Sequence, residues 1–433
     1  MGYWPSFLRL QKLKMTKKIL LIIGILIVIG IAVFMIFFSA PATETGESRV
    51  GFSIRDYLPF GNSDNTSNNA STTDQNNNGN QDDNIVTTLS NQPIQELRKI
   101  SNEPVAGAIV FNIGTTSVVR FVEKGTGNVY EARSDSNQIL RLTNTTIPKI
   151  VRAFWLPSGS GFLAQTLMAE NEIIETNFVK LNKNQASSTV ESLTPYSTTI
   201  GKLPTDIKEI TIKPDGSKIF YYTVSNSVSN WYVSNPDGTN SSLVASNPLT
   251  EWLPKWIAGN VVMMQNKGSS KSLGYTYSFD VSTKNFKKVG TGAAGISSNP
   301  NSDGSLSLIS NGGSLPKLFL VDNKETTITA VSEYTLAEKC VWFKEKSPSV
   351  LCAVPYDVPR GDYPDVWYKG LVSTYDDIKR IDLTLNTSSD VANLYGLSDE
   401  QIDVVDISLS PDETHLIFRN KIDGYLWLLR IEE

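Results

Sequence analysis

The sequence predicts an all-β protein, a β-propeller that follows one N-terminal transmembrane helix and a disordered tether. Three observations lead to this prediction: an unbroken apolar run near the N-terminus, a polar stretch after it, and a strand–turn–strand unit that recurs over the rest of the 433 residues. These features divide the chain into segments 1–18, 19–38, 39–95 and 96–433. We interpret them as a basic cytoplasmic segment, a membrane anchor, a flexible tether and an extracytoplasmic propeller.

The apolar run extends from Ile19 to Phe38 and contains only apolar residues and glycine. At a helical rise of about 1.5 Å per residue, its length covers the roughly 30 Å hydrocarbon core of a bilayer. Basic residues precede the run without an acidic one among them: Arg9, Lys12, Lys14, Lys17 and Lys18. Because positive charge stays on the cytoplasmic side, we expect a single-pass protein of the cell membrane with its N-terminus inside.

Two alternatives concern the ends of this anchor. Ala40, Pro41 and Ala42 form an A-x-A-like site, so cleavage after Ala42 would make the run a signal peptide. The run is longer than the roughly 7 to 15 apolar residues of a signal peptide, which favours an uncleaved anchor. Translation from Met15 in place of Met1 would leave the topology unchanged.

The predicted tether is rich in Asn, Ser, Thr, Asp and Gln, most of all between Gly61 and Asn84. Such a composition has too little apolar surface to offset the entropy of ordering the chain. One apolar patch, Phe52 to Phe60, interrupts it. This patch either docks on the membrane, the propeller or a partner, or is only a short apolar stretch in a linker.

From Glu103 onward, short β-branched or aromatic runs alternate with turns. Four hairpins share one frame, in the sequences AFWLPSGSGFLAQTL (153–167), ITIKPDGSKIFYYTV (210–224), SSNPNSDGSLSLISN (297–311) and DISLSPDETHLIFRN (406–420). Pro, Asp and Gly each favour such a turn, since Pro fixes φ, Asp bonds its own backbone and Gly accepts a positive φ. Further strands are expected from Asn230, Tyr275, Lys317 and Tyr425.

Successive units begin about 40 to 65 residues apart, a period typical of propellers and other repeat arrays. We expect seven blades, with six as the alternative, near residues 103–145, 149–196, 207–247, 250–291, 294–333, 336–395 and 403–433. The last unit has three strands, one short of a blade. An early strand such as Val105 to Asn112 is expected to supply the fourth and close the ring, which removes an exposed sheet edge.

The turn segments IKPDGSKIFYY and LSPDETHLIF resemble the repeat of TolB-like propellers, relatives of the WD-repeat group. The order of anchor, tether, LRKISNEPVAGAIVF, TNTTIPKI, EKCVWFKEKSPSVLCAVP and YPDVWYKG is similar to uncharacterised membrane-anchored, propeller-like envelope proteins of candidate-phyla (Parcubacteria-type) bacteria. This resemblance implies an envelope protein of unassigned role and no catalytic residues. Glu413, where the repeat usually has Gly, departs from the pattern.

Cys340 and Cys352 lie in two apolar runs around a KEKSP turn. If the hairpin is centred near Lys346, the two cysteines face each other at a distance that a disulfide can bridge. An extracytoplasmic location and an even cysteine count favour the disulfide over two buried thiols.

The residues that carry chemistry are few, and we predict no catalytic, cofactor or metal site. His415 is the only histidine, has no serine motif beside it, and is expected to face solvent at a turn. NPNSDG (299–304) lacks the twelfth-position glutamate of a calcium loop and is interpreted as a turn. Four loop carboxylates are candidates for an acid/base pair, with solvated side chains as the simpler interpretation: Asp362, Asp365, Asp376 and Asp377.

One surface stands out, the long loop YDVPRGDYPDVWYKG (356–370). Aromatic residues on long loops are candidate anchors for partners. We therefore predict a partner surface formed by Tyr363, Asp365, Trp367 and Tyr368, with the alternative that these aromatics fold down to cap a blade.

The net charge of the chain after its basic N-terminal segment limits the kinds of ligand that we expect. Without the five basic residues before Ile19, the chain carries 34 basic and 44 acidic residues, a net charge of −10. Such a body does not favour nucleic acid or anionic lipid as a ligand. The leading prediction is a non-catalytic scaffold that binds another envelope protein or a surface polymer. The alternatives are a glycan-active enzyme with carboxylates on one propeller face, or a structural subunit of a surface or secretion apparatus.

Overall fold

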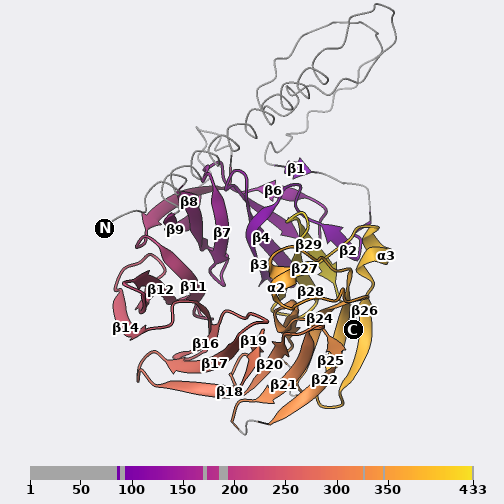
Figure 1. The fold of residues 1–433 in the computed structure, drawn as a ribbon. Coiled ribbons are helices and arrows are strands. Elements are labelled where there is room, and N and C mark those ends of the chain that lie inside the picture. Colours follow the sequence, from indigo (N-terminus) through magenta and orange to yellow (C-terminus); the bar gives the residue numbers. More distant parts are fainter. Residues whose placement is uncertain are drawn as a thin grey trace, which may run out of the picture. The chain divides into compact units, whose positions relative to one another are not determined.

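The computed structural model describes residues 85–87, 93–168, 173–184, 194–324, 327–344 and 347–431. Over these residues the chain forms seven antiparallel sheets arranged as the blades of a β-propeller (Figure 1). Both the all-β class and the count of seven blades are therefore confirmed. The observed sheets follow the seven predicted units in order along the chain.

Blades 1 to 4 are built from consecutive strands. Blade 1 has β3 (Val105–Ile113), β4 (Thr116–Glu123), β5 (Val129–Arg133), β6 (Ile139–Arg141) and an added outer strand, β1 (Ile85–Thr87). Blade 2 has β7 (Ile150–Trp155), β8 (Gly161–Met168), β9 (Ile173–Lys183) and β10 (Tyr196–Lys202). Blade 3 has β11 (Ile207–Ile212), β12 (Ile219–Ser225), β13 (Val228–Ser234) and β14 (Ser242–Asn247). Blade 4 has β15 (Trp252–Ala258), β16 (Val261–Asn266), β17 (Leu273–Asp280) and β18 (Phe286–Ala294).

Blades 5 to 7 complete the ring. Blade 5 has β19 (Ser297–Pro300), β20 (Leu306–Asn311), β21 (Lys317–Asp322) and β22 (Ile328–Tyr334). Blade 6 has β23 (Cys340–Trp342), β24 (Ser349–Pro355), β25 (Asp376–Asp382) and β26 (Thr387–Ala392). Blade 7 has β27 (Val404–Leu409), β28 (His415–Asn420), β29 (Leu426–Arg430) and β2 (Leu97–Lys99). Three short helices accompany them: η2 (Ala337–Lys339), α2 (Asp365–Tyr368) and α3 (Leu394–Ser398).

The hairpin turns that were predicted from Pro, Asp and Gly share one hydrogen-bond pattern. In the β11–β12 turn, Asp215 Oδ1 accepts from the backbone N–H and the hydroxyl of Ser217. Asp412 in the β27–β28 turn accepts likewise from Thr414. The residue after each aspartate has a positive φ, 74° at Gly216 and 64° at Glu413. Glu413 thus takes the glycine conformation of the repeat in spite of its side chain.

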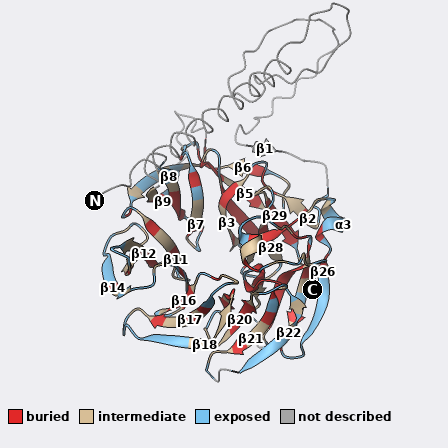
Figure 2. Cartoon of the chain, viewed as in Figure 1, coloured by how far each residue is buried: buried red, intermediate tan, exposed pale blue. Residues whose placement is uncertain are grey.

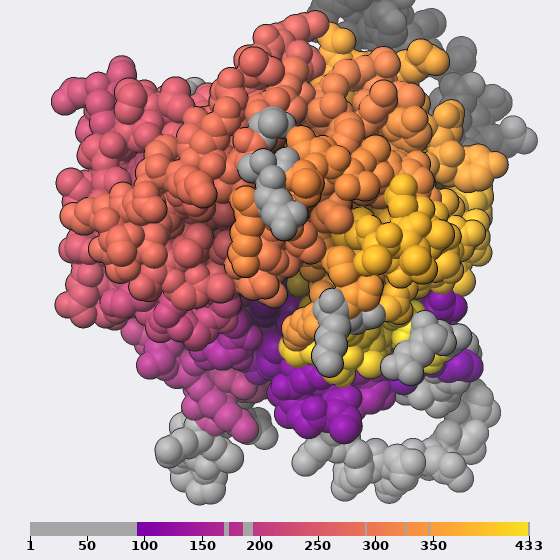
Figure 3. Space-filling model, turned by 90° about the horizontal axis from the view of Figure 1, so that it is seen from below, coloured from indigo at the N-terminus to yellow at the C-terminus, as the bar shows by residue number. Residues whose placement is uncertain are grey.

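The ring closes through β2, which pairs with β29 as the outermost strand of blade 7. Arg430 N–H donates to Glu96 O and Ile100 N–H donates to Leu426 O, each at 2.8 Å. The space-filling view shows the indigo N-terminal part of the ring against the yellow C-terminal part (Figure 3). The prediction that Val105 to Asn112 supplies the closing strand is wrong, because that segment is β3, the first strand of blade 1. The closing strand has only three residues, too few for a recognisable alternation.

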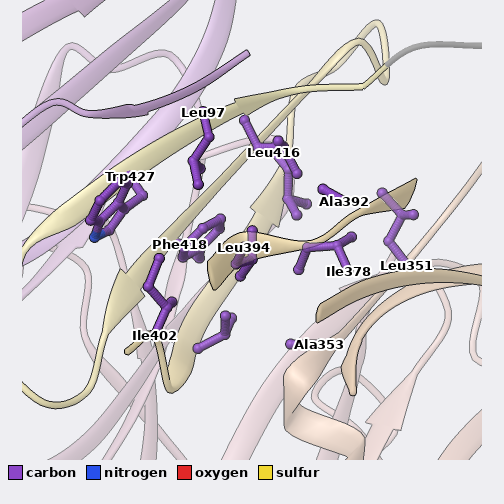
Figure 4. Packing of buried hydrophobic residues seen from close by; sticks show 12 residues of the cluster. Leu97, Leu351, Ala353, Ile378, Ala392, Leu394, Ile402, Leu416, Phe418 and Trp427 are labelled. Carbon is purple, nitrogen blue, oxygen red and sulfur yellow. The ribbon is translucent and has the colours of Figure 1, made fainter. Parts of the chain in front are cut away.

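The apolar core lies between neighbouring blades. Figure 2 shows the buried segments of the strands in red. The cluster between blades 6 and 7 combines Leu351, Ala353 and Ile378 of blade 6 with Leu416, Phe418 and Trp427 of blade 7 (Figure 4). Leu97 of β2 joins it and is 5% exposed. The first strand of each blade lies toward the centre of the ring, where β3 contacts β7 and β11 contacts β15 (Figure 1).

The expected anchor, Ile19 to Phe38, the basic segment 1–18 and most of the expected tether 39–95 lie outside the described residues. Strand β1 falls within the range predicted as tether and pairs with β6. Among the residues that the structure describes, no helix has the length and apolar character needed to cross a membrane.

The disulfide between Cys340 and Cys352 is confirmed. The two residues are direct partners on β23 and β24, as a hairpin centred near Lys346 requires. Both side chains are buried in the apolar core between blades 5 and 6.

Candidate functional site

The connection between β24 and β25, residues 356–375, folds inward over the ring, and its helix α2 lies near the centre (Figure 1). Tyr363 and Gly313 of blade 5 form an isolated β-bridge. The Asp365 carboxylate accepts from the Ser270 N–H at 2.5 Å, and Ser270 belongs to the β16–β17 loop of blade 4. This connection, which we call the inner loop, therefore joins blade 6 to two other blades.

The four residues of the predicted partner surface all lie in the inner loop, in different environments. Tyr363 and Trp367 are buried, so the prediction of an exposed partner surface does not hold for them. They pack with Leu336 beneath the loop, the arrangement that the capping alternative describes. Asp365 is half-buried, and Tyr368 keeps an exposed face.

Three cavities follow one another around the centre of the ring, and together we call them the central channel. The first, of about 430 Å³, is lined by β3, β7 and β11. The second, of about 420 Å³, lies beside α2 and β27 and shares Asp406 and Arg419 with the first. The third, of about 160 Å³, lies against β15 and β19 and shares Glu338 and Tyr368 with the second. The first strands of the blades thus form most of its wall.

Charged side chains line this wall, mostly as pairs. Arg152 Nη1 donates to both carboxylate oxygens of Glu209, at 2.9 and 3.1 Å, which joins blade 2 to blade 3. Arg419 Nε donates to Asp406 Oδ2 at 2.6 Å. Charge-assisted hydrogen bonds are short and directional. These two ion pairs therefore hold the charged side chains of the channel wall in fixed orientations.

The third cavity holds a different set of groups. The Tyr368 hydroxyl donates to Glu338 Oε1 at 2.6 Å. Lys255 Nζ donates to the neutral Asn299 Oδ1 at 2.6 Å, and no carboxylate of the described residues pairs with it. Solvent reaches the Glu338 and Lys255 side chains inside the channel, although protein surrounds them. The surrounding protein displaces part of their hydration, which raises the pKa of Glu338 and lowers the pKa of Lys255 to about 8.

A buried charge cluster borders the second cavity, which Lys339 and Trp367 help to line. Its members are Lys339, Asp376, Asp403, Thr374 and Trp367. Lys339 Nζ donates to Asp376 Oδ2 and Asp403 Oδ1, both at 2.7 Å, and to the Thr374 hydroxyl at 2.9 Å. Both carboxylates are 0% exposed. The Trp367 indole N–H donates to Asp403, while Lys339 Nζ lies 5.0 Å from the centre of the indole ring. The cluster therefore fastens the inner loop to blades 6 and 7.

The charges in the cluster stabilise one another. Burial alone would lower the pKa of Lys339, but the two carboxylates outweigh it, so this pKa is raised. Burial works against ionised Asp403 as well, yet Lys339 and the Trp367 N–H keep the pKa of Asp403 low. At Asp376 the effect of burial is larger than the opposing effect of Lys339, so the pKa of Asp376 is raised. A lysine held between two acids in this way is a structural group, since none of its partners is free to exchange protons with a ligand.

The four candidate acid/base carboxylates do not gather at one site, although the neighbours Asp376 and Asp377 both contribute to the wall of one pocket. Asp376 lies in the buried cluster, Asp365 is bound to Ser270, and Asp362 pairs with exposed Lys271. Asp377 is half-buried on the other side of β25. Nowhere in the described ranges do three His, Cys, Asp or Glu residues form a group suited to a metal ion. The NPNSDG segment is a hairpin turn in which Asp303 accepts from Ser305.

His415 does not face solvent freely, in contrast to the prediction. It is half-buried, and its Nδ1 lies 3.1 Å from the Ser117 hydroxyl and 2.8 Å from the Thr414 hydroxyl. Ser117 lies on β4 of blade 1, so the histidine on β28 connects blade 7 to blade 1, the two blades that meet where the ring closes. Both hydroxyls lie within hydrogen-bonding distance of the same ring nitrogen, Nδ1. We interpret this arrangement as a packing contact between the two blades.

The sequence analysis did not identify the channel residues Arg152, Lys255, Asp406 and Arg419, or Glu209, the partner of Arg152. A usable signal was present, because four of these five interrupt the apolar first strand of a unit. At Arg152, Glu209 and Asp406 this strand also carries a β-bulge or register shift, which re-aims side chains. The strand pattern alone could not show that these residues face a common channel.

Comparison with known proteins bears on the fold. No protein-family model matches the chain, and no curated protein matches it. Among solved structures, the chain is similar to oligogalacturonate lyase from Vibrio parahaemolyticus, with a TM-score of 0.50 and 12% identity over 81% of this chain and 96% of that one. At this identity the likeness shows the fold alone.

Two further structures have lower scores. An oligogalacturonate lyase in complex with manganese has a TM-score of 0.49 and 12% identity, over 74% of this chain and 87% of that chain. TolB from Acinetobacter baumannii has a TM-score of 0.39 and 10% identity, over 78% of this chain and 65% of that chain. The seven-bladed propeller predicted from the recurring strand–turn–strand unit is present in the structure, and the expected relation to membrane-anchored envelope proteins stays a prediction.

Proposed function

We propose that this chain is a non-catalytic binding scaffold of the bacterial cell envelope, whose propeller binds a segment of another protein or of a surface polymer at the central channel. The observation that carries the proposal is the channel itself, with its pre-oriented ion pairs and the Tyr368 ring at its rim. Fixed polar groups around a concave site give orientation and specificity to a ligand. The mixed charges suit a polar chain with groups of both signs.

The location is part of the same proposal. Ile19 to Phe38 anchors the chain in the membrane, the N-terminus is cytoplasmic, and the propeller lies outside. The Cys340–Cys352 disulfide supports this placement, because structural disulfides persist mainly in oxidising, extracytoplasmic compartments. Protease added to intact spheroplasts should digest or release the propeller and spare a short N-terminal fragment. Protection of the propeller would contradict the topology.

A binding role is favoured over the glycan-active enzyme by the state of the acids near the channel. Asp376 and Asp403 are close enough to share Lys339 Nζ, yet they are fully buried and engaged. A general acid or base must reach the proton that it transfers. As arranged here, these two carboxylates hold the inner loop in place and do not reach a substrate.

Photo-crosslinking in native membranes tests the binding role. A benzoylphenylalanine placed at Tyr368, on the channel rim, should capture one discrete partner protein or polymer. The same probe at Leu385, which is exposed in the β25–β26 turn, serves as the control. The K255M and R419Q variants should reduce the capture at position 368. Equal capture at both positions, or none at position 368, would refute a channel ligand, and self-capture in regular arrays would favour the structural-subunit alternative.

A further inference from the structure

A separate pocket lies where blade 6 meets blade 7, outside the central channel. It has a volume of about 420 Å³ and is lined by Tyr356, Tyr375, Asp376, Asp377, Asn393, Tyr395 and Ile402. None of these residues lines the central channel. We call it the tyrosine pocket.

Three tyrosine rings form its rim, and all three are exposed: Tyr356 by 87%, Tyr375 by 47% and Tyr395 by 52%. The rings of Tyr375 and Tyr395 meet edge to face, with their centres 5.8 Å apart. Exposed tyrosines scattered over a surface need no explanation, but three around one pocket form an aromatic enclosure. Aromatic faces carry a negative quadrupole that attracts cations.

The apolar core and secondary structure support the walls of the tyrosine pocket. Ile402 at the floor is buried in the core between the two blades, where it packs near Leu394 and Ile378 (Figure 4). Tyr356 N–H donates to Tyr375 O at 2.8 Å, which continues the β24–β25 ladder into the pocket wall. Asn393 caps α3 through the Gly396 N–H and so fixes the turn that carries Tyr395. The backbone at the three tyrosines is therefore held by secondary structure, and the rings of Tyr375 and Tyr395 also contact each other.

One carboxylate of the pocket, Asp377, forms no ion pair within the part of the chain that the structure describes. Asp377 Oδ1 accepts from the Leu394 N–H at 3.2 Å, and no described lysine or arginine forms an ion pair with Asp377. The nearest candidate, Lys379, instead lies 3.5 Å from Glu333 and 3.6 Å from Asp390. The negative charge of Asp399 beside the rim raises the pKa of Tyr395. Burial raises the pKa of Asp377, as expected of an unpaired carboxylate in an apolar pocket.

We infer that the tyrosine pocket binds an alkylammonium cation, either a lysine side chain of a partner or a quaternary ammonium group. The three rings supply cation–π attraction, and Asp377 supplies the counter-charge. The net negative charge of the chain outside its predicted basic segment favours such a ligand at long range.

The test measures binding of small cations to the full chain in detergent by ligand-observed NMR and calorimetry. The probes are choline, the amide of Nα-acetyl-trimethyllysine, the amide of Nα-acetyl-lysine, and 3,3-dimethylbutan-1-ol, which has the shape of choline without its charge. The charged probes should bind saturably, and the neutral isostere should bind about tenfold more weakly. Tighter binding of the lysine amide would identify a basic protein segment as the source. Tighter binding of choline or trimethyllysine would identify a quaternary ammonium group.

Matched variants locate the binding. Y395A and D377N should weaken binding about fivefold or more, which is near the range of a single cation–π contact or ion pair. Y395F keeps the aromatic face and should retain binding. Y334A, on an exposed tyrosine of blade 5, and D390N, on an exposed acid near the pocket, should leave it unchanged.

Three outcomes would overturn the inference: equal binding of choline and its neutral isostere, no effect of D377N and Y395A, or no saturable binding of any cation. Competition by a neutral oligosaccharide at the same residues would instead identify a sugar site. Because these variants leave the channel intact, the crosslink from position 368 should persist in them. Failure of one proposal is thereby distinguishable from failure of the other.

Discussion

Lys339 shows how one side chain determines the position of a loop. Its ammonium group is 2% exposed and binds two carboxylates that lie 37 and 64 residues further along the chain. Burying three charges costs several kcal/mol per ion before the ions attract one another. The cluster persists because Thr374 and Trp367 satisfy the remaining hydrogen-bonding capacity of these ions.

Replacing Lys339 by methionine should lower the free energy of unfolding by about 3–5 kcal/mol, since two buried carboxylates would lose the ammonium group between them, and Lys421 Nζ, 3.4 Å from Asp403 Oδ2, would offset only part of their charge. Urea denaturation measures the change. K271M is the matched control, because Lys271 pairs with Asp362 at an exposed site and should change stability by less than about 1 kcal/mol. The double variant K339M/D376N should recover part of the loss. Equal effects of K339M and K271M would contradict a structural role for the cluster.

His415 gives a second prediction at this scale, and as the only histidine it has an unambiguous NMR signal. Burial lowers its pKa below the ordinary value of 6.5, while Asp412 opposes the shift. In this case the unfolded chain takes up the proton first. Stability should therefore be full above about pH 6.5 and should fall as the pH drops toward the folded-state pKa.

A titration of the His415 ring proton, followed in the folded protein, checks the direction of the shift. The H415Q variant should lose this part of the pH dependence of unfolding and keep the rest. A measured pKa at or above 6.5 would show that the ring is more solvated than its contacts with Ser117 and Thr414 indicate.

At the scale of elements, the β23–β24 hairpin is the one with a covalent link. Cys340 and Cys352 close a loop of twelve residues in sequence. In the chain-entropy view, a cross-link of this loop length contributes about 2–4 kcal/mol by restricting the unfolded chain. The C340A/C352A variant should be destabilised by that amount in urea. Reductant should destabilise the wild type and leave the variant unaffected, and the absence of any difference would contradict the prediction.

The elements also show why some features were predictable from sequence and others were not. The β27–β28 hairpin was evident because its signals are local: alternate apolar residues, a proline and an aspartate within eleven positions. The cysteine pair was predictable for the same reason. Burial of Tyr363 and Trp367 was not, since it depends on Gly313 and Asp403 in other blades. Arg152 and Glu209 likewise meet only after two blades have packed.

For the whole molecule, the decisive element is the strand that closes the ring. The last unit has three strands of its own, and β2 supplies the fourth from the other end of the described chain. Its three residues were too short to be recognised, whereas the missing strand in the last unit did indicate that closure must occur. The site of closure is also where His415 bridges to Ser117 and Arg419 donates to Val105 O.

A chain that lacks residues 1–103 should therefore be much less stable than one that lacks residues 1–92. The chain that lacks residues 1–103 loses the β2–β29 ladder and the buried Leu97 side chain. It also exposes β29 as an open sheet edge, which promotes aggregation. Of the described strands, the chain that lacks residues 1–92 loses only β1, an added strand at the edge of blade 1. Thermal unfolding and light scattering distinguish the two, and a stable, monomeric protein without residues 1–103 would disprove closure by β2.

A point substitution separates closure from the effects of truncation. L97A should cost about 2–5 kcal/mol, as for other leucines removed from a packed core. I94A is the matched control, because Ile94 lies just before β2 and is 39% exposed, so its loss should change stability by about 0.5 kcal/mol or less. If L97A proved as mild as I94A, β2 would be a peripheral strand, and the ring would be held by contacts between blades 7 and 1 alone.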